Sequence, residues 1–289
     1  MNTSNFRKYQ LKHLSTIIGV KPEKLSFILS NIDVYYKERK EVKMDTRTNK
    51  PKTYLDGTPK FRVIRPSFKD LKFVQKRIKA LILAPIPLPK NIHGGVKKKS
   101  NITNAKIHQG KKYIFTTDLQ DFYPSISSSA VFDTFLNIGF TDSMANYLTK
   151  LTTWKYELPQ GAPTSTHVSN LFFLRTDYEL IKFCDENSIT YTRYIDDLTF
   201  SSQYCFKCHT SKLLEIIKDT SDLKLSHRKI NYGGKQKVTG IYVYNNKIDA
   251  PESIIALAID EVFNNLPDKP YNDYLNRIRK TNVKRYKNL

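Results

Sequence analysis

Three aspartates carry the clearest chemical signal in this sequence. Asp196 and Asp197 are adjacent in a Tyr-Ile-Asp-Asp run that begins at Tyr194, and Asp118 lies 78 residues before Asp196. Two adjacent carboxylates on a turn, together with a third at the end of another strand, can hold two Mg²⁺ ions about 3.5 to 4 Å apart. Ions held in this way activate a hydroxyl and stabilise a leaving pyrophosphate. The pattern therefore predicts a metal site for nucleotidyl transfer.

The segments around these acids predict the strands that would position them. Residues 189–194 and 198–200 are rich in β-branched and aromatic side chains, which favours a hairpin with the two adjacent acids at its tip. Residues 114–117 lead into Asp118 in the same way. Three acids that converge at strand ends repel one another unless cations neutralise them. The alternative is a solvated turn, in which Asp is also common.

The order of the remaining elements predicts an α+β fold. Short strands and helices follow one another without a regular βαβ alternation, which argues against a doubly wound sheet. A basic hairpin with its turn at Asp56-Gly57 is expected over residues 42–64, a loop rich in Pro, Gly and Lys over 85–110, and a strand over 238–244. Periodic apolar residues predict helices over residues 6–18, 21–31, 68–83, 128–138, 141–152, 164–186, 207–218, 253–263 and 272–285.

Composition limits the partners and the compartment. The 289 residues are 39% hydrophobic, enough for one large domain or several subdomains around a core. Lys and Arg number 48 against 27 Asp and Glu, and the formal charge of +21 predicts a polyanionic partner. An apolar run of about 18 residues and a signal-peptide pattern are both lacking, so we expect a cytoplasmic protein that does not bind a membrane. Three cysteines agree with a reducing compartment. The Cys-Phe-Lys-Cys-His run at 205–209 is interpreted as an incidental helix start.

The ordered motifs resemble those of reverse transcriptases with a right-hand palm, and among them the retron reverse transcriptases of bacteria. In this resemblance, which covers about residues 5–265, Asp118 begins the first palm motif and residues 158–170, 194–197 and 225–230 form the second, third and fourth. It implies a right-hand polymerase: an N-terminal helical cap over 1–41, fingers over 42–112, a palm over 113–244 with fingers insertions around 128–165, and a short helical thumb over 245–289.

The resemblance assigns catalytic and nucleotide-binding roles. Asp118, Asp196 and Asp197 would be catalytic and hold two Mg²⁺ ions, with Mn²⁺ as a substitute, and the backbone carbonyl of Leu119 would be a further ligand. Lys229 would act as a general acid near the pyrophosphate. Tyr123 would lie beneath the incoming sugar and exclude a 2′ hydroxyl, although it could instead be a core tyrosine packed beside Phe122. Contacts to the triphosphate and to the nascent base pair are implied for Arg62 with Lys60, and for Gln160 with Gly161.

Two short signatures narrow the resemblance to retron enzymes. Residues 104–108 have the form Asn-Ala-x-x-His and residues 238–240 read Val-Thr-Gly. The resemblance implies that these segments bind the enzyme's own structured noncoding RNA, which serves as template and primer for a branched RNA-linked DNA. The basic last helix could lie along a nucleic-acid groove or be a packed helix with a solvated face. The predicted RNA-binding residues are Asn104, His108, Val238, Thr239, Gly240, Arg277, Lys284 and Arg285.

One residue departs from the family pattern, and several functions remain open. Ile195 stands where alanine is most common in the third motif. The leading hypothesis is an RNA-directed DNA polymerase that uses dNTPs and acts in antiphage defence with a separately encoded effector, with oligomers able to form through the RNA or the effector. The alternatives are a group II intron-like reverse transcriptase, an abortive-infection reverse transcriptase that adds nucleotides without a template, and a noncatalytic RNA-binding scaffold.

Overall fold

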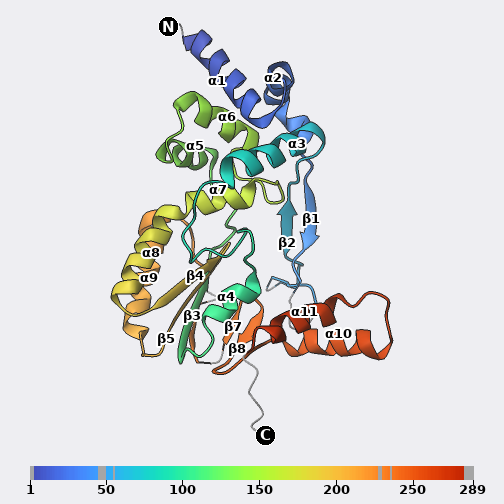
Figure 1. The fold of residues 1–289 in the computed structure, drawn as a ribbon, viewed down its shortest axis with the longest axis vertical. Helices are drawn as coiled ribbons and strands as arrows, with labels where there is room; N and C mark the ends of the chain where they lie inside the picture. The colour runs from blue at the N-terminus through green and yellow to red at the C-terminus, as the bar shows by residue number, and fades with distance from the viewer. Residues whose placement is uncertain (1–2, 45–49, 55, 227–229, 235, 283–289) are drawn as a thin grey trace. The chain divides into compact units, whose positions relative to one another are not determined.

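The computed structural model describes residues 3–44, 50–54, 56–226, 230–234 and 236–282 (Figure 1). The chain divides into two compact units. The first comprises Met1–Leu88 and Asp121–Leu174, and the second comprises Pro89–Gln120 and Arg175–Leu289. Among the residues that the structure describes, no helix combines the length and the apolar character needed to cross a membrane.

The first unit is mostly helical. Its core contains Leu14, Leu25, Leu71 and Leu148, all fully buried, from four helices. Pro22 opens its helix at a position where the missing N–H group is not needed. The helical elements are α1 (Thr3–Ile18), α2 (Pro22–Ser30), η1 (Ile32–Tyr35), α3 (Lys69–Ile78), the π-helical turn η2 (Lys79–Leu83), α5 (Ser128–Asn137), α6 (Asp142–Thr152) and α7 (Ser165–Phe172).

An antiparallel hairpin completes this unit. β1 (Arg39–Val42) pairs with β2 (Phe61–Ile64), and Arg39 lies opposite Ile64. The predicted turn at Asp56-Gly57 is present, because the Asp56 carboxylate accepts hydrogen bonds from both the backbone N–H and the hydroxyl of Thr58. The pairing nevertheless begins before residue 42, where the prediction placed its start. The four residues of β1 are exposed and mostly charged, so they lack the apolar alternation that identifies a strand.

The second unit holds two antiparallel sheets. In the first, β3 (Tyr113–Asp118), β4 (Thr190–Tyr194), β5 (Asp197–Ser202) and β6 (Asn231–Gly233) lie in the order β4-β5-β3-β6. In the second, β7 (Gln236–Val238), β8 (Ile241–Val243) and β9 (Ile248–Asp249) are neighbours in sequence order. Antiparallel strands mixed with helices confirm the α+β class.

Helices pack on these sheets within the second unit. The helical elements are α4 (Asn101–Ile107), α8 (Leu174–Glu186, which belongs to this unit from Arg175), η3 (Lys207–His209), α9 (Thr210–Ser221), α10 (Glu252–Phe263) and α11 (Pro270–Lys280). Ile102, Val238, Ile248, Ala258 and Ile278 belong to one buried cluster, which joins α4, the second sheet, α10 and α11.

Three further predicted elements differ from the structure. The expected loop over 85–110 contains α4, which begins with a reciprocal pair of hydrogen bonds between Ser100 and Thr103. The expected strand over 238–244 is two strands joined at Thr239 and Gly240, whose φ angles of +46° and +87° make a tight hairpin turn. The expected helix over 164–186 is two helices: α7 ends at Phe172, Phe173 is its C-cap, and α8 begins at Leu174.

Candidate metal centre and nucleic-acid-binding residues

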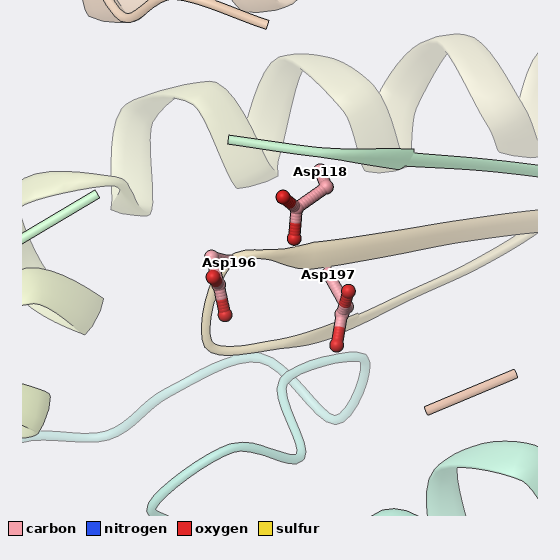
Figure 2. A group of neighbouring side chains, drawn as sticks. All are labelled: Asp118, Asp196 and Asp197. Carbon is pink, nitrogen blue, oxygen red and sulfur yellow. The ribbon is translucent and has the colours of Figure 1, made fainter. Parts of the chain in front are cut away.

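The three aspartates meet at the ends of the first sheet's strands. β3 and β5 pair so that Asp118 lies opposite Asp197, and Asp196 occupies the two-residue loop between β4 and β5. One ligand oxygen from each carboxylate lies within 4.8 Å of the other two. Figure 2 shows the three side chains gathered at this edge. Asp118 is 6% exposed, whereas Asp196 and Asp197 are half-buried. The cluster is therefore buried at Asp118 and open to solvent at the other two carboxylates.

Backbone hydrogen bonds fix the ends of the strands that carry these acids. The Leu119 N–H donates to the Asp196 carbonyl at 3.1 Å, which ties the end of β3 to the hairpin loop. The Ser226 N–H donates to the Asp118 carbonyl at 2.8 Å, and Leu225 pairs with Leu119. The start of the fourth predicted motif therefore lies beside the first aspartate. Lys229, its predicted general acid, lies outside the described residues.

The loop between β4 and β5 holds a strained residue. Ile195 has a φ of +61°, a conformation that costs an L-residue roughly 1 to 2 kcal/mol and that glycine usually adopts at this place in a tight hairpin. Its carbonyl accepts a hydrogen bond from Nη1 of Arg193 at 2.9 Å. Strained backbone next to functional groups persists where surrounding contacts hold it in place.

The cluster of three carboxylates fits hard divalent cations. Oxygen ligands suit Mg²⁺, and a bound cation removes the repulsion between three acids held this close. The arrangement of two acids on a hairpin and a third on the neighbouring strand also suits a pair of ions. Asp118, Asp196 and Asp197 are thus the residues that would hold them.

Comparison with known proteins shows the family of this chain. A model described as "Reverse transcriptase (RNA-dependent DNA polymerase)" matches residues 48–242. The chain belongs to the reverse transcriptase family. It is 31% identical to the retron Se72 reverse transcriptase of Salmonella heidelberg over 76% of this chain and 53% of that protein. With the retron Ec86 reverse transcriptase of Escherichia coli it shares 32% identity over 65% of this chain and 60% of that protein.

These matches confirm the resemblance to retron reverse transcriptases, although the chain spans only 53% and 60% of the length of these two relatives. A solved structure of telomerase from Candida albicans aligns with 81% of this chain and 52% of its own at 8% identity, and its TM-score of 0.48 is too low to support an argument.

The residues predicted to contact the nucleotide all belong to the first unit. Arg62 is exposed on β2 opposite Glu41, and the ammonium of Lys60 lies 4.8 Å from the centroid of the Tyr54 ring. The Tyr123 hydroxyl lies 3.1 Å from that of Thr166. Contact of these side chains with a nucleotide stays a prediction.

The Gln160-Gly161 turn packs against the end of β2. The Gln160 carbonyl accepts a hydrogen bond from the Arg65 N–H at 2.7 Å. Gly161 has a φ of +108°, and a Cβ at this position would lie 3.0 Å from Cγ2 of Ile64. Any other residue would be strained here and would press on β2. Gly161 therefore lies close to Ile64 of the same chain. Contact of Gln160 and Gly161 with a base pair stays a prediction.

Three of the predicted RNA-binding residues, Asn104, His108 and Val238, are fully buried. Asn104 and His108 lie on or next to α4 with no exposed surface. His108 places Nδ1 2.7 Å from the Ser201 hydroxyl and Nε2 2.7 Å from the Thr192 hydroxyl. Burial lowers the pKa of His108 to about 3, with smaller effects from His93 and Lys111. His108 thus anchors α4 to β4 and β5, and a role for Asn104 and His108 in RNA binding stays a prediction.

The helix that carries the first retron-like signature packs beside the second signature, since Ala105 of α4 and Val238 belong to the same buried cluster. The Asn101 side chain donates to the Thr239 carbonyl at 3.3 Å and to the Tyr274 hydroxyl of α11 at 2.6 Å, and the Thr239 hydroxyl donates to the Asn101 carbonyl at 3.2 Å. Val238 is buried, whereas Gly240 is exposed at the turn. Asn101 and Tyr274 were missed in the sequence, because neither belongs to a recognisable motif.

The last described helix has a packed face and a basic face. Leu275 and Ile278 of α11 are buried, while Arg277 is exposed with its guanidinium carbon 5.8 Å from the centroid of the Tyr274 ring. This agrees with a packed helix that has a solvated basic face, and nucleic-acid contact by Arg277 stays a prediction. Lys284 and Arg285 lie outside the described residues.

Proposed function

We propose that this chain is an RNA-directed DNA polymerase that copies its cognate structured noncoding RNA into RNA-linked multicopy single-stranded DNA. The observation that carries the proposal is the meeting of Asp118, Asp196 and Asp197 within 4.8 Å, in a chain of the reverse transcriptase family. A noncatalytic scaffold has no need for such a group. The similarity to the retron Se72 and Ec86 reverse transcriptases supports the choice of a retron-type RNA template.

The chemistry follows from the carboxylate group. Two Mg²⁺ ions, or Mn²⁺ in their place, would supply activation of the attacking hydroxyl and neutralisation of the leaving pyrophosphate. The protein's part is to hold the ligands in place. Asp118 and Asp197 are held by the register of β3 and β5, and Asp196 by the Leu119 hydrogen bond to its carbonyl. The Leu119 carbonyl is proposed as a further ligand.

Selection of the nucleotide is proposed for residues of the first unit, and proton transfer for Lys229 of the second. Arg62, assisted by Lys60, is proposed to bind the triphosphate, because a guanidinium makes paired hydrogen bonds to phosphate. Tyr123 is proposed to exclude the 2′ hydroxyl of a ribonucleotide. Gln160 and Gly161 are proposed to support the template and the nascent base pair, and Lys229 to protonate the pyrophosphate.

The RNA partner is supported by charge and by the meeting of the two signatures. A formal charge of +21 favours a polyanion. Gly240 and Arg277 are exposed near the Asn101, Thr239 and Tyr274 contacts, and they are the proposed RNA-facing residues of this region. We extend the proposal, by the retron resemblance, to antiphage defence in a bacterium together with a separately encoded effector.

The product on the native RNA tests this function. Purified protein, the noncoding RNA transcribed next to its gene, Mg²⁺ and dNTPs should give one discrete DNA that remains joined to RNA until ribonuclease treatment. Its sequence should match the RNA template. Asp197→Asn should abolish the product and leave RNA binding intact. Absence of product from the wild-type protein with bound RNA would overturn the proposal, and DNA unrelated to the RNA would indicate nucleotide addition without a template.

A further inference from the structure

The hairpin loop that carries Asp196 is held from within the protein by a buried arginine. The structure assigns to Arg193 the role of a positioning residue, which fixes the Ile195 peptide and thereby sets the direction in which the Asp196 and Asp197 carboxylates point. This inference rests on the proposed function, since it concerns the same metal centre. Arg193 itself is too deeply buried to touch a substrate, with no exposed surface.

The guanidinium of Arg193 is immobilised by Asp177 of α8. Nε donates to Oδ1 of Asp177 at 2.9 Å and Nη2 donates to Oδ2 at 2.6 Å. The Tyr191 hydroxyl donates to the same Oδ1 at 2.7 Å. Both members of the ion pair are fully buried. A planar guanidinium that donates two hydrogen bonds to one carboxylate has a fixed orientation. The N–H groups of its third nitrogen, Nη1, therefore also point in a fixed direction.

That third nitrogen reaches the strained loop. Nη1 donates to the Ile195 carbonyl at 2.9 Å, and Ile195 adopts the φ of +61° that an isoleucine disfavours. The Ile195 carbonyl belongs to the peptide that leads directly into Asp196. A rotation of this peptide would turn the Asp196 side chain away from Asp118, so the hydrogen bond from Arg193 acts on the geometry of the carboxylate group.

A neighbouring segment supports the same loop from its other side. The Arg193 N–H donates to the Asn91 carbonyl at 3.0 Å and the Arg193 carbonyl accepts from the His93 N–H at 2.8 Å, so residues 91–93 run beside β4 as a short parallel addition. Gly94 follows, and a Cβ there would lie 2.3 Å from the Ile195 nitrogen. The loop is thus confined between Gly94 and the Arg193 guanidinium.

The chemistry of this arrangement favours a positioning role over simple core packing. A buried ion pair carries a large desolvation penalty, and apolar residues of similar volume stabilise a core at least as well. An apolar side chain at 193 could not donate to the Ile195 carbonyl. An apolar pair could replace the Arg193–Asp177 ion pair in the core, but it could not make the contact to the loop of the metal centre.

Two substitutions and one control test the inference. Arg193→Lys keeps the positive charge and removes the planar fork, and Gly94→Ala disturbs the loop from its other side. Leu180→Ala is the control. Leu180 is a fully buried residue of α8, so its truncation should lower stability, and its apolar side chain cannot make a hydrogen bond to the loop. The first readout is Mn²⁺ binding to the protein alone by electron paramagnetic resonance. The second is the Mg²⁺ dependence of kcat, measured together with the KM for dNTP.

We expect Arg193→Lys and Gly94→Ala each to weaken Mn²⁺ binding by about tenfold and to raise the half-saturating Mg²⁺ concentration by a similar factor, as groups that orient metal ligands do. The KM for dNTP at saturating Mg²⁺ should stay within about twofold of the wild-type value, because neither substitution removes a contact to the bound nucleotide. Leu180→Ala should lower the melting temperature and leave both metal measurements within about twofold, because an added cavity changes stability alone. The double variant should be less severe than the product of the single effects, because both act on the backbone of Ile195.

The outcomes separate this inference from the proposed function. Wild-type Mn²⁺ affinity in Arg193→Lys, or an equal loss in Leu180→Ala, would overturn the positioning role even if DNA synthesis is confirmed. If Arg193→Lys does not fold, Gly94→Ala decides the question by the same two measurements. A shift in Mn²⁺ binding in a protein that makes no DNA would support the positioning role and overturn only the proposed function.

Discussion

Ile195 adopts a left-handed backbone conformation between β4 and β5, at a place where hairpins usually have glycine. Its departure from the family's alanine is visible in the sequence, but its conformation is not. The supports come from Arg193 and from Gly94, and the latter is far away in the chain. The three aspartates, by contrast, were predicted correctly as a group, because acids at the ends of strands leave a recognisable pattern. A single arginine within a strand leaves none.

Tyr123 is predicted to discriminate against ribonucleotides. Tyr123→Ala should lower the ratio of kcat/KM for a dNTP over the matching ribonucleotide by at least about tenfold, because removal of a blocking group is worth about 1 to 3 kcal/mol. Primer extension with each nucleotide measures the ratio. Tyr123→Phe, which keeps the ring and loses the contact of its hydroxyl with Thr166, should retain the discrimination. Equal ratios in Tyr123→Ala and the wild-type protein would show that the ring is only a core side chain.

His108 should make stability depend on pH. Its pKa in the folded chain is lowered by burial from the ordinary 6.5 to about 3, so folding favours the neutral ring. This contribution is complete above pH 6.5 and is lost as the pH falls from there toward 3, because the unfolded chain then binds a proton that the folded chain excludes. His108→Gln should flatten the decline of the free energy of unfolding between pH 6.5 and 4, measured by urea titration. A steep slope retained in His108→Gln would contradict the assignment.

At the scale of elements, the sequence predicts best where side chains alternate. The hairpin around Asp196 and the strand before Asp118 were expected because their β-branched and aromatic residues continue to the acids. Residues 238–244 also look like one strand, yet the positive φ angles at Thr239 and Gly240 fold them into two. α4 was missed because Ile102 and Ala105 are its only apolar residues buried in the core, and seven residues give too short a period.

Glu261 is predicted to stabilise α11 from the end of α10. Its carboxylate is almost buried and accepts hydrogen bonds from the N–H groups of Tyr271 at 3.2 Å and Asn272 at 2.9 Å, in the first turn of α11. Glu261→Ala should lower the free energy of unfolding by about 1 kcal/mol, as loss of a helix cap does. Urea unfolding measures this. Glu179→Ala, an exposed change on α8, should have a much smaller effect; an equal effect would show that Glu261 does not cap α11.

For the whole molecule, net charge is the property that can be read most directly from the sequence. The formal charge of +21 does not specify the fold, but it predicts how RNA affinity responds to salt. The affinity should fall by at least about tenfold between 50 and 200 mM salt, because bound phosphates release counterions.

Arg277 should contribute to this salt dependence. Arg277→Gln should reduce the slope of log K against log salt by about 1, the value for one phosphate contact. Lys24→Gln is the control, because the Lys24 ammonium already pairs with Asp70 at 2.6 Å. Filter binding across a salt series measures both variants. An unchanged slope in Arg277→Gln would place Arg277 away from the RNA.

The division of the chain into cap, fingers, palm and thumb stays a prediction at this scale. It was drawn from the order of motifs, whereas the two compact units follow the density of internal contacts and join segments that are far apart in sequence, such as Pro89–Gln120 with Arg175–Leu289. Packing of this kind depends on which buried faces fit together, and the order of motifs along the chain does not contain that information.

The central claim is that Asp118, Asp196 and Asp197 form the metal centre of RNA-templated DNA synthesis. Extension of a DNA primer on an RNA template, with Mg²⁺ and radiolabelled dNTPs, tests it most directly. We predict a labelled product that matches the template, requires the divalent ion and disappears in Asp118→Asn and Asp197→Asn proteins that still fold and bind the template. Extension that persists in either variant, or no extension by wild-type protein bound to the template, would contradict the claim.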